Sequence, residues 1–304
     1  MTVALPKTLL VLERGWLSAN NILCFDGDDA TLIDSGYVAH AEQTVALVGS
    51  ALHGRRLNRL INTHSHSDHI GGNAALQAAF NCEIMGPAGL HAAIADWDQD
   101  ALLLSPLGQQ AARFQHDQLI SAGCEIEMGE LNWQALAVPG HDMEALAYYN
   151  PEKRILISGD ALWENGFGVI FPELLGEANG LASTRETLEM LAKLPIDIVI
   201  PGHGSPFVTV DAAFERAFRR LTNFQANIEQ LAWHAIKVIV SFAMMEKRCL
   251  PLADFPAFVL SLPFAVDVNA RYLDLPDDKM TERVERELLL VNALKRQGDL
   301  ILAA

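Results

Sequence analysis

Residues 63–73 read Thr-His-Ser-His-Ser-Asp-His-Ile-Gly-Gly-Asn, a run that places three histidines and one aspartate within six positions. Imidazole nitrogens bind zinc, iron and similar ions, and a carboxylate adds the negative charge that a divalent cation prefers. A polar turn that caps a helix is the alternative interpretation. The whole chain has 10 histidines, so their clustering here favours a metal site with candidate ligands at His64, His66, Asp68 and His69.

The segments on either side of this cluster predict how it is presented. Residues 57–62 have the pattern of a strand, and residues 70–80 have that of a helix. In extended backbone, side chains two positions apart point the same way, so His64, His66 and Asp68 would share one side. Asp68 begins the helical turn, where acidic groups are favoured. Ligands that face two adjacent points in this way predict two metal ions side by side.

Three later segments share one local pattern, in which a short apolar run stops at a turn and delivers one potential ligand. Residues 135–141 end in Pro-Gly-His, residues 154–160 end in Gly-Asp, and residues 196–203 end again in Pro-Gly-His. A single histidine after a turn is more often solvated than bound to metal. Because all three segments repeat the architecture of the first cluster, they add three candidate ligands: His141, Asp160 and His203.

These motifs resemble those of the metallo-β-lactamase-fold hydrolases, with Asp34 in Leu-Ile-Asp-Ser-Gly as a further block, and the resemblance covers about residues 8–210. It implies that Asp34 supports the site without binding metal and that Asp160 bridges two ions. The first ion would be held by His64, His66 and His141, and the second by Asp68, His69 and His203. The implied cofactors are two divalent metal ions, with zinc as the first choice and iron or manganese as alternatives.

The resemblance also implies a reaction class. Diiron relatives carry a carboxylate at the position of His66, so hydrolysis is favoured over reduction of oxygen or nitric oxide. Glyoxalase II-type thioesterases share all seven ligand positions but differ from this chain at residues 142–145. We expect a dinuclear hydrolase whose bridging hydroxide attacks an ester, thioester, lactone or similar small substrate, with Asp68 orienting the nucleophile or carrying a proton. The alternatives are a mononuclear-iron sulfur dioxygenase and a lactamase-fold endoribonuclease that uses the C-terminal tail.

The predicted elements of residues 9–200 alternate between runs of strands and single helices, which favours two packed sheets flanked by helices. The resemblance implies the same α/β architecture, an αββα sandwich with the metals at one edge. We assign residues 1–210 to this catalytic domain.

Helices dominate the remainder of the chain. Residues 212–247 are predicted to be a long helix broken at most once, residues 281–296 another helix, and residues 298–302 a small terminal strand. A helix that closes on a strand resembles the end of a winged-helix unit. Residues 211–304 are therefore expected to form a mostly helical, winged-helix-like C-terminal domain.

The net charge of −16 limits the choice of partner, and nearly all of it lies in residues 1–210. Enzymes that act on nucleic acid usually display a basic stripe to the phosphates. The best basic cluster is formed by Arg216, Arg219 and Arg220, which we interpret as a solvated helix face. Nucleic acid is therefore disfavoured, and a small-molecule substrate is expected.

Other features bear on location and on the pocket. The most apolar window, residues 235–245, contains Lys237 and is too short to span a bilayer, so no membrane partner is expected. No secretory signal is evident, and a homo-oligomer is compatible with the sequence. The aromatic-rich residues 163–171, with Trp16, are expected either to wall the metal pocket or to pack in the core. Four scattered cysteines are expected to be buried free thiols in a reducing cytoplasm: Cys24, Cys82, Cys124 and Cys249.

Overall fold

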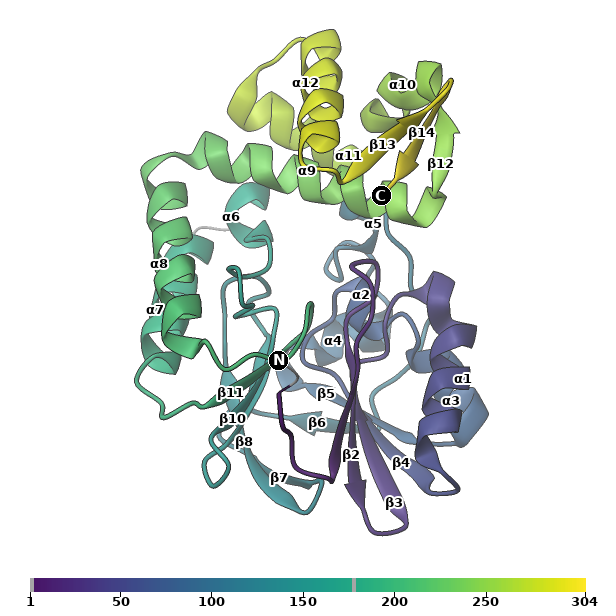
Figure 1. Ribbon diagram of the computed structural model, residues 1–304, viewed down its shortest axis with the longest axis vertical. Coiled ribbons are helices and arrows are strands. Elements are labelled where there is room, and N and C mark those ends of the chain that lie inside the picture. Colours follow the sequence, from purple (N-terminus) through teal and green to yellow (C-terminus); the bar gives the residue numbers. More distant parts are fainter. Residues whose placement is uncertain (1–2, 177–178) are drawn as a thin grey trace.

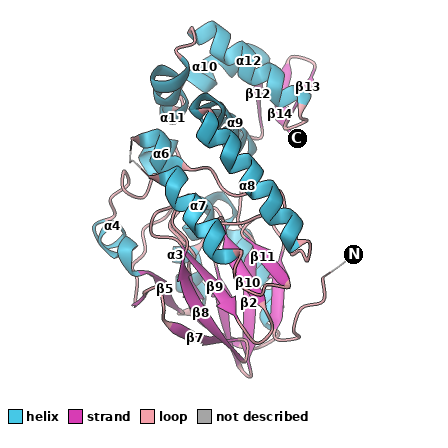
Figure 2. Ribbon diagram, turned by 90° about the vertical axis from the view of Figure 1, so that its left-hand side faces the viewer, coloured by secondary structure: helices cyan, strands magenta, loops and turns pink. Residues whose placement is uncertain are grey.

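The computed structural model describes residues 3–176 and 179–304 and contains two stacked sheets (Figures 1 and 2). The first is six-stranded, with strands in sequence order; its early pairs are antiparallel, and its pairs from β3 onward are parallel. Its strands are β1 (Leu9–Leu12), β2 (Asn21–Asp26), β3 (Asp29–Ile33), β4 (Arg56–Ile61), β5 (Glu83–Pro87) and β6 (Gln118–Ile120).

The second sheet is five-stranded in the order β11-β10-β9-β8-β7, and only its β10–β11 pair is parallel. Every residue of β9 and β10 is buried. Strands that are buried on both faces have mostly apolar sequences without alternation. β8 instead alternates between buried and more exposed side chains. The strands are β7 (Glu125–Met128), β8 (Leu131–Ala137), β9 (Leu146–Asn150), β10 (Ile155–Gly159) and β11 (Ile198–Pro201).

Helices cover the outer face of each sheet, so the expected αββα sandwich is confirmed (Figure 2). Trp133 and Tyr148 are buried between the sheets, within a cluster that draws on both. Helices α1 (Ala41–Leu52), α3 (Asn73–Phe80) and α4 (His91–Asp96) pack on the first sheet, and α7 (Gly180–Leu191) and α8 (Val210–Ala226) pack on the second. Shorter helical pieces are α2 (Ser67–Ile70), α5 (Leu104–Leu107), α6 (Phe171–Leu175), η1 (Val38–His40) and η2 (Ala88–Leu90).

The long helix α9 (Ile228–Lys247) lies between the sandwich and the C-terminal elements (Figure 1). Asn227 separates it from α8 with an extended backbone, and the Asn227 side chain accepts a hydrogen bond from Gln230 N, which caps α9. By length and composition α9 could cross a membrane, and it is longer than the apolar window in the sequence suggested. Half of its most apolar window is buried within the protein, so here it packs as a core helix.

The C-terminal region is helical, as expected, and carries a three-stranded sheet in the order β12-β14-β13. The helix predicted to run to residue 296 is wrong at its end: it stops at Leu290, and Leu294–Gln297 form a strand. Asn292 explains this end because it adopts a left-handed backbone with φ of 57°. The elements are β12 (Cys249–Pro251), η3 (Leu252–Asp254), α10 (Phe255–Leu260), α11 (Pro263–Val268), η4 (Asn269–Leu273), α12 (Asp277–Leu290), β13 (Leu294–Gln297) and β14 (Leu300–Ala303).

Two further expectations need correction. The helix predicted over residues 70–80 is divided at Gly71 and Gly72 into α2 and α3. The expectation of four buried cysteines is wrong for Cys124 and Cys249, which are exposed, because one lies in a loop and the other on a short outer strand.

Gly71 lies where the backbone after Ser67 approaches the backbone of Tyr37 and Val38 closely. A Cβ at this position would lie 2.7 Å from both Ser67 O and Tyr37 C, and closer still to Val38 N. Gly71→Ala should therefore destabilise the protein by about 1–3 kcal/mol, measured as a lower midpoint of urea unfolding. Gly49→Ala is the matched control, because Gly49 is exposed on α1 and the atom nearest to its added Cβ would lie 3.6 Å away. An equal stability of wild type and Gly71→Ala would contradict this packing.

Candidate metal centre

The histidine cluster lies directly after β4, at the edge where the ends of the two sheets meet. Asn62 and Thr63 leave the strand, and His66 has the extended backbone that precedes α2. His69 then lies within α2 and is fully buried. A strand, a short extended segment and one helical turn thus present the four predicted ligands of this cluster.

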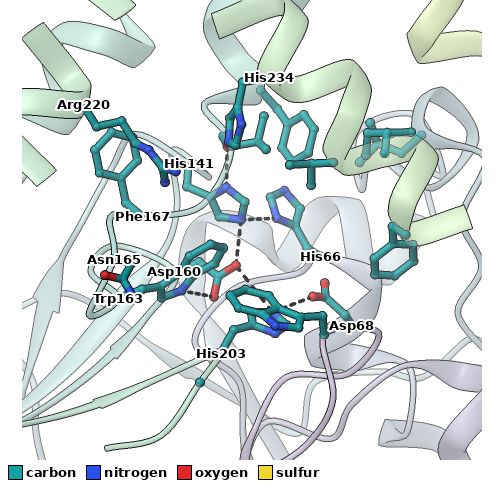
Figure 3. Close-up of a pocket in the computed structure, with 18 of the residues that line it drawn as sticks. His66, Asp68, His141, Asp160, Trp163, Asn165, Phe167, His203, Arg220 and His234 are labelled. Atoms are coloured by element: carbon teal, nitrogen blue, oxygen red, sulfur yellow. Dashed lines mark hydrogen bonds and ion pairs between the residues drawn. The ribbon is translucent and has the colours of Figure 1, made fainter. Parts of the chain in front are cut away.

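The other predicted ligands come from the ends of other strands, as their Gly and Pro-Gly turns indicated. His141 follows β8, Asp160 follows β10 directly, and His203 follows β11. Figure 3 shows the side chains of His66, His141, Asp160 and His203 turned toward one another. The structure therefore brings all seven sequence-predicted residues to one place.

The ligand atoms form groups that could each hold a metal ion. In each group the atoms lie within 4.8 Å of one another, and the groups are His64 with His66 and His141, His64 with His69 and Asp160, and Asp68 with His69 and His203. The first and last are the two sets that the resemblance implied.

Asp160 lies between these two sets. Its Oδ2 is 3.4 Å from His141 Nε2 and 3.9 Å from His203 Nε2, and its Oδ1 is 3.4 Å from His69 Nε2. Trp163 Nε1 donates to Oδ1 at 3.1 Å, which fixes the carboxylate. This position between the sets is the one a bridging ligand would need.

Several buried nitrogens at the site lack a hydrogen-bond partner in the described part of the chain: His64 Nε2, His69 Nε2 and His203 Nδ1. Buried polar atoms of folded proteins are nearly always paired, because an unpaired one costs free energy. A metal ion would supply the missing partner of His64 and His69. The donor set of imidazoles and carboxylates therefore fits divalent cations such as zinc.

Hydrogen bonds on the far side of two rings determine which nitrogen faces the site. His69 Nδ1 donates to Asp34 Oδ2 at 2.7 Å, and His141 Nδ1 donates to the carbonyl of Val169 at 2.5 Å. Each ring therefore keeps its Nε2 lone pair for a metal. Asp34 supports the site in this way, and it is absent from the three groups that could hold an ion.

Burial and charge set the protonation of the site. Burial lowers the pKa of His66 to about 4, and burial together with His66 lowers the pKa of His141 to about 4. Burial alone would raise the pKa of Asp160, but the neighbouring His69 and His203 lower it well below its usual value. His66, His141 and Asp160 are thus in the forms that bind metal ions. At His69 burial alone would lower the pKa, but Asp34, Asp160 and Asp68 raise it well above its usual value, so a metal ion would displace a proton from this ring.

A pocket of about 400 Å³ opens over this group. Trp16, Trp163, Phe167 and Phe171 line the pocket, and Phe167 and Phe171 also belong to the hydrophobic core, so both alternatives for the aromatic residues apply. Trp16 is 56% exposed and stacks on the His203 ring, with centroids 5.3 Å apart. Because Trp16 is exposed and contacts His203, this wall extends from the predicted ligands to the protein surface.

The sequence interpretation missed the opposite wall of the pocket. Arg220 of α8 and His234, Val238 and Phe242 of α9 line it, and Figure 3 shows His234 and Arg220 above the metal-ligand candidates. His234 belongs to none of the sequence motifs described above. The spacing of residues 234, 238 and 242 places them on one helix face, but that spacing does not show what the face covers.

Comparison with known proteins agrees with this geometry. Residues 14–203 match the sequence profile of the metallo-beta-lactamase superfamily. A hydroxyacylglutathione hydrolase from Rhodospirillum rubrum is 30% identical over 227 residues, which cover 72% of this chain and 79% of that protein. Another, from Bartonella tribocorum, is 29% identical over 144 residues, or 47% of each chain.

A metallo-beta-lactamase family protein from Thermus thermophilus shares the fold, with a TM-score of 0.61 at 17% identity over 99% of this chain and 100% of that one. The chain belongs to the metallo-beta-lactamase superfamily, as the length of the matched segment shows. It is a metal-dependent hydrolase, the class to which its hydroxyacylglutathione hydrolase relatives belong.

Replacing Asp34 tests the support that it gives to His69. An amide in Asp34→Asn has one acceptor oxygen, so it cannot serve both Thr63 N, now 2.9 Å from Oδ1, and His69 Nδ1. We expect the affinity for zinc to fall by about 10- to 100-fold, measured by competition with a chelating indicator. Asp29→Asn, at the solvent-accessible start of β3, is the control and should bind zinc as the wild type does. Unchanged affinity in Asp34→Asn would contradict this role.

Proposed function

We propose that the protein uses two divalent metal ions, zinc in the first instance, to hydrolyse an acyl ester, thioester or lactone in a small molecule. The observation that carries this proposal is the pair of ligand groups on either side of Asp160, beneath a 400 Å³ pocket. The assigned ligands are the seven predicted ones: His64, His66, Asp68, His69, His141, Asp160 and His203.

Two bound ions would lower the pKa of a shared water toward about 7 and polarise the carbonyl of the substrate. The residues around them orient the water and accept its proton. Asp68 Oδ2 lies 2.9 Å from His203 Nε2, and Asp68 lines the pocket. Its carboxylate can therefore orient the attacking water and take its proton, and Asp68 is the catalytic residue of this proposal.

The aromatic wall supports an acyl group as the part of the substrate nearest the metals. Trp16, Trp163 and Phe171 offer apolar surface beside the ligands, where a short acyl chain can bury its carbons. The hydroxyacylglutathione hydrolases among the relatives favour a thioester. Neither the family match nor these relatives support the dioxygenase or the endoribonuclease alternative.

The cellular setting is part of the proposal. The four cysteines are free thiols, which suits a reducing cytoplasm. The small-molecule pocket requires no nucleic-acid or membrane partner, and assembly into a homo-oligomer is compatible with it.

Metal removal gives the first test. Purified protein should contain about two divalent ions per chain, and dialysis against a chelator should abolish hydrolysis of S-lactoylglutathione and 4-nitrophenyl acetate until zinc is restored. His66→Ala should lose most of the metal and the turnover, while His91→Ala, at an exposed histidine, should keep both. Full turnover in the metal-free protein would refute the proposal.

The role of Asp68 is tested separately. Asp68→Asn should lower kcat by about 10²- to 10⁴-fold, because the amide cannot accept a proton. The rate is to be normalised to the metal content of the same sample, with Asp100→Asn, an exposed substitution, as the control. If the normalised kcat is unchanged, Asp68 is a ligand without a role in proton transfer.

A further inference from the structure

A second cavity adjoins the metal pocket. It has a volume of about 630 Å³ and is lined mainly by residues of α8 and α9, with Arg283 of α12. The two cavities share Asn165, Arg220 and His234, and Figure 3 shows Asn165 and Arg220 on the same side of the metal pocket. The two cavities therefore adjoin at these three residues.

The charges that line the second cavity are mostly positive. Lys237 and Arg283 are each paired with Glu287, at 2.9 Å. In contrast, among the residues that the structure describes, no carboxylate lies within ion-pair distance of the three lining arginines of α8, namely Arg216, Arg219 and Arg220. Glu229 is the acidic residue of the described lining, to which Glu287 does not belong. With Glu287 counted, five basic side chains face two carboxylates, so the cavity has an excess of three positive charges in a chain whose net charge is −16.

The three arginines line the cavity from one face of α8. They lie at positions i, i+3 and i+4 of α8, which share one helix face. Arg216 Nε donates to the carbonyl of Glu164 at 2.7 Å, while Arg219 is exposed and Arg220 is half-buried. The interpretation of this cluster as a solvated helix face is therefore incomplete.

Arg220 stands where the two cavities join. Its guanidinium lies against Gly166, where an added Cβ would collide with Nη1, so this glycine makes room for it. Burial lowers the pKa of Arg220 below its usual value, and within the described chain no acceptor is hydrogen-bonded to it. A half-buried guanidinium without an acceptor is costly unless a ligand supplies one.

We infer that the second cavity binds a phosphate group on the arm of the substrate that is remote from the hydrolysed bond. This inference rests on the proposed hydrolase function and specifies its substrate class as a phosphate-bearing acyl ester or thioester. Guanidinium groups bind phosphate oxygens in a bidentate manner, and an excess of three positive charges suits a phosphate dianion better than a single carboxylate. The ester or thioester bond would then lie at the metal ligands, while the arginines of α8 hold the phosphate at the far end of the acyl chain.

The experiment compares three esters of equal chain length with the zinc-loaded protein: 4-nitrophenyl hexanoate, mono-4-nitrophenyl adipate and 4-nitrophenyl 6-phosphonohexanoate. The readout is the ratio of kcat/KM for the phosphonate to kcat/KM for the neutral ester. We expect a ratio of about 10 to 100, since a charge-assisted hydrogen bond contributes that much. Arg220→Gln and the triple variant Arg216→Gln/Arg219→Gln/Arg220→Gln should bring this ratio to about 1.

Arg286→Gln is the matched control, because it removes the same charge from an exposed position of α12 outside the cavity lining. It should keep the wild-type ratio. A wild-type ratio near 1, or a ratio that survives in the triple variant, would overturn the inference. An equal preference for the adipate would overturn the assignment to phosphate. Cleavage of single-stranded RNA that depends on the three arginines would overturn the assignment of the cavity to a small-molecule substrate. Absence of metal-dependent hydrolysis of the neutral ester would instead contradict the proposed function.

Discussion

The site depends on the buried carboxylate of Asp34, which hydrogen-bonds from the end of β3 to the segment that follows β4. Asp34 follows β3, and it accepts hydrogen bonds from Thr63 N, from Thr63 Oγ1 and from His69 Nδ1, at 2.7 to 2.9 Å. It does so from a left-handed backbone with φ of 56°, which few residues adopt without compensation. Because Thr63 precedes the histidine cluster and His69 closes it, this carboxylate fixes the segment that carries four of the seven predicted ligands.

The candidate ligands could be placed at one site from the sequence because their signals are local. Each is a strand end followed by a turn, and strand ends of stacked sheets meet at one edge, so His141, Asp160 and His203 could be placed beside the first cluster. The wall formed by Arg220 and His234 was missed because it depends on how α8 and α9 pack against the sandwich, a contact between distant parts of the chain. The end of α12 was misplaced for a local reason, the left-handed Asn292, which resembles an ordinary helical residue in the sequence.

The C-terminal helices do more than cover the second sheet. α9 presents His234 and Phe242 to the metal pocket, and α8 presents Arg220 to both cavities. Burial lowers the pKa of His234 to about 3, and the nearby Arg220 and Lys237 act in the same direction, so this ring is neutral at pH 7. The acidic sandwich thus supplies the metal ligands, while the helices that follow it supply the positive charge.

The central claim is that two metal ions lie on either side of Asp160. A crystal structure of the zinc-loaded protein, with anomalous scattering recorded above and below the zinc edge, tests it most directly. We predict two anomalous peaks about 3.5–4 Å apart, one bounded by His64, His66 and His141 and the other by Asp68, His69 and His203. A single peak at full occupancy, or peaks away from Asp160, would contradict the dinuclear site.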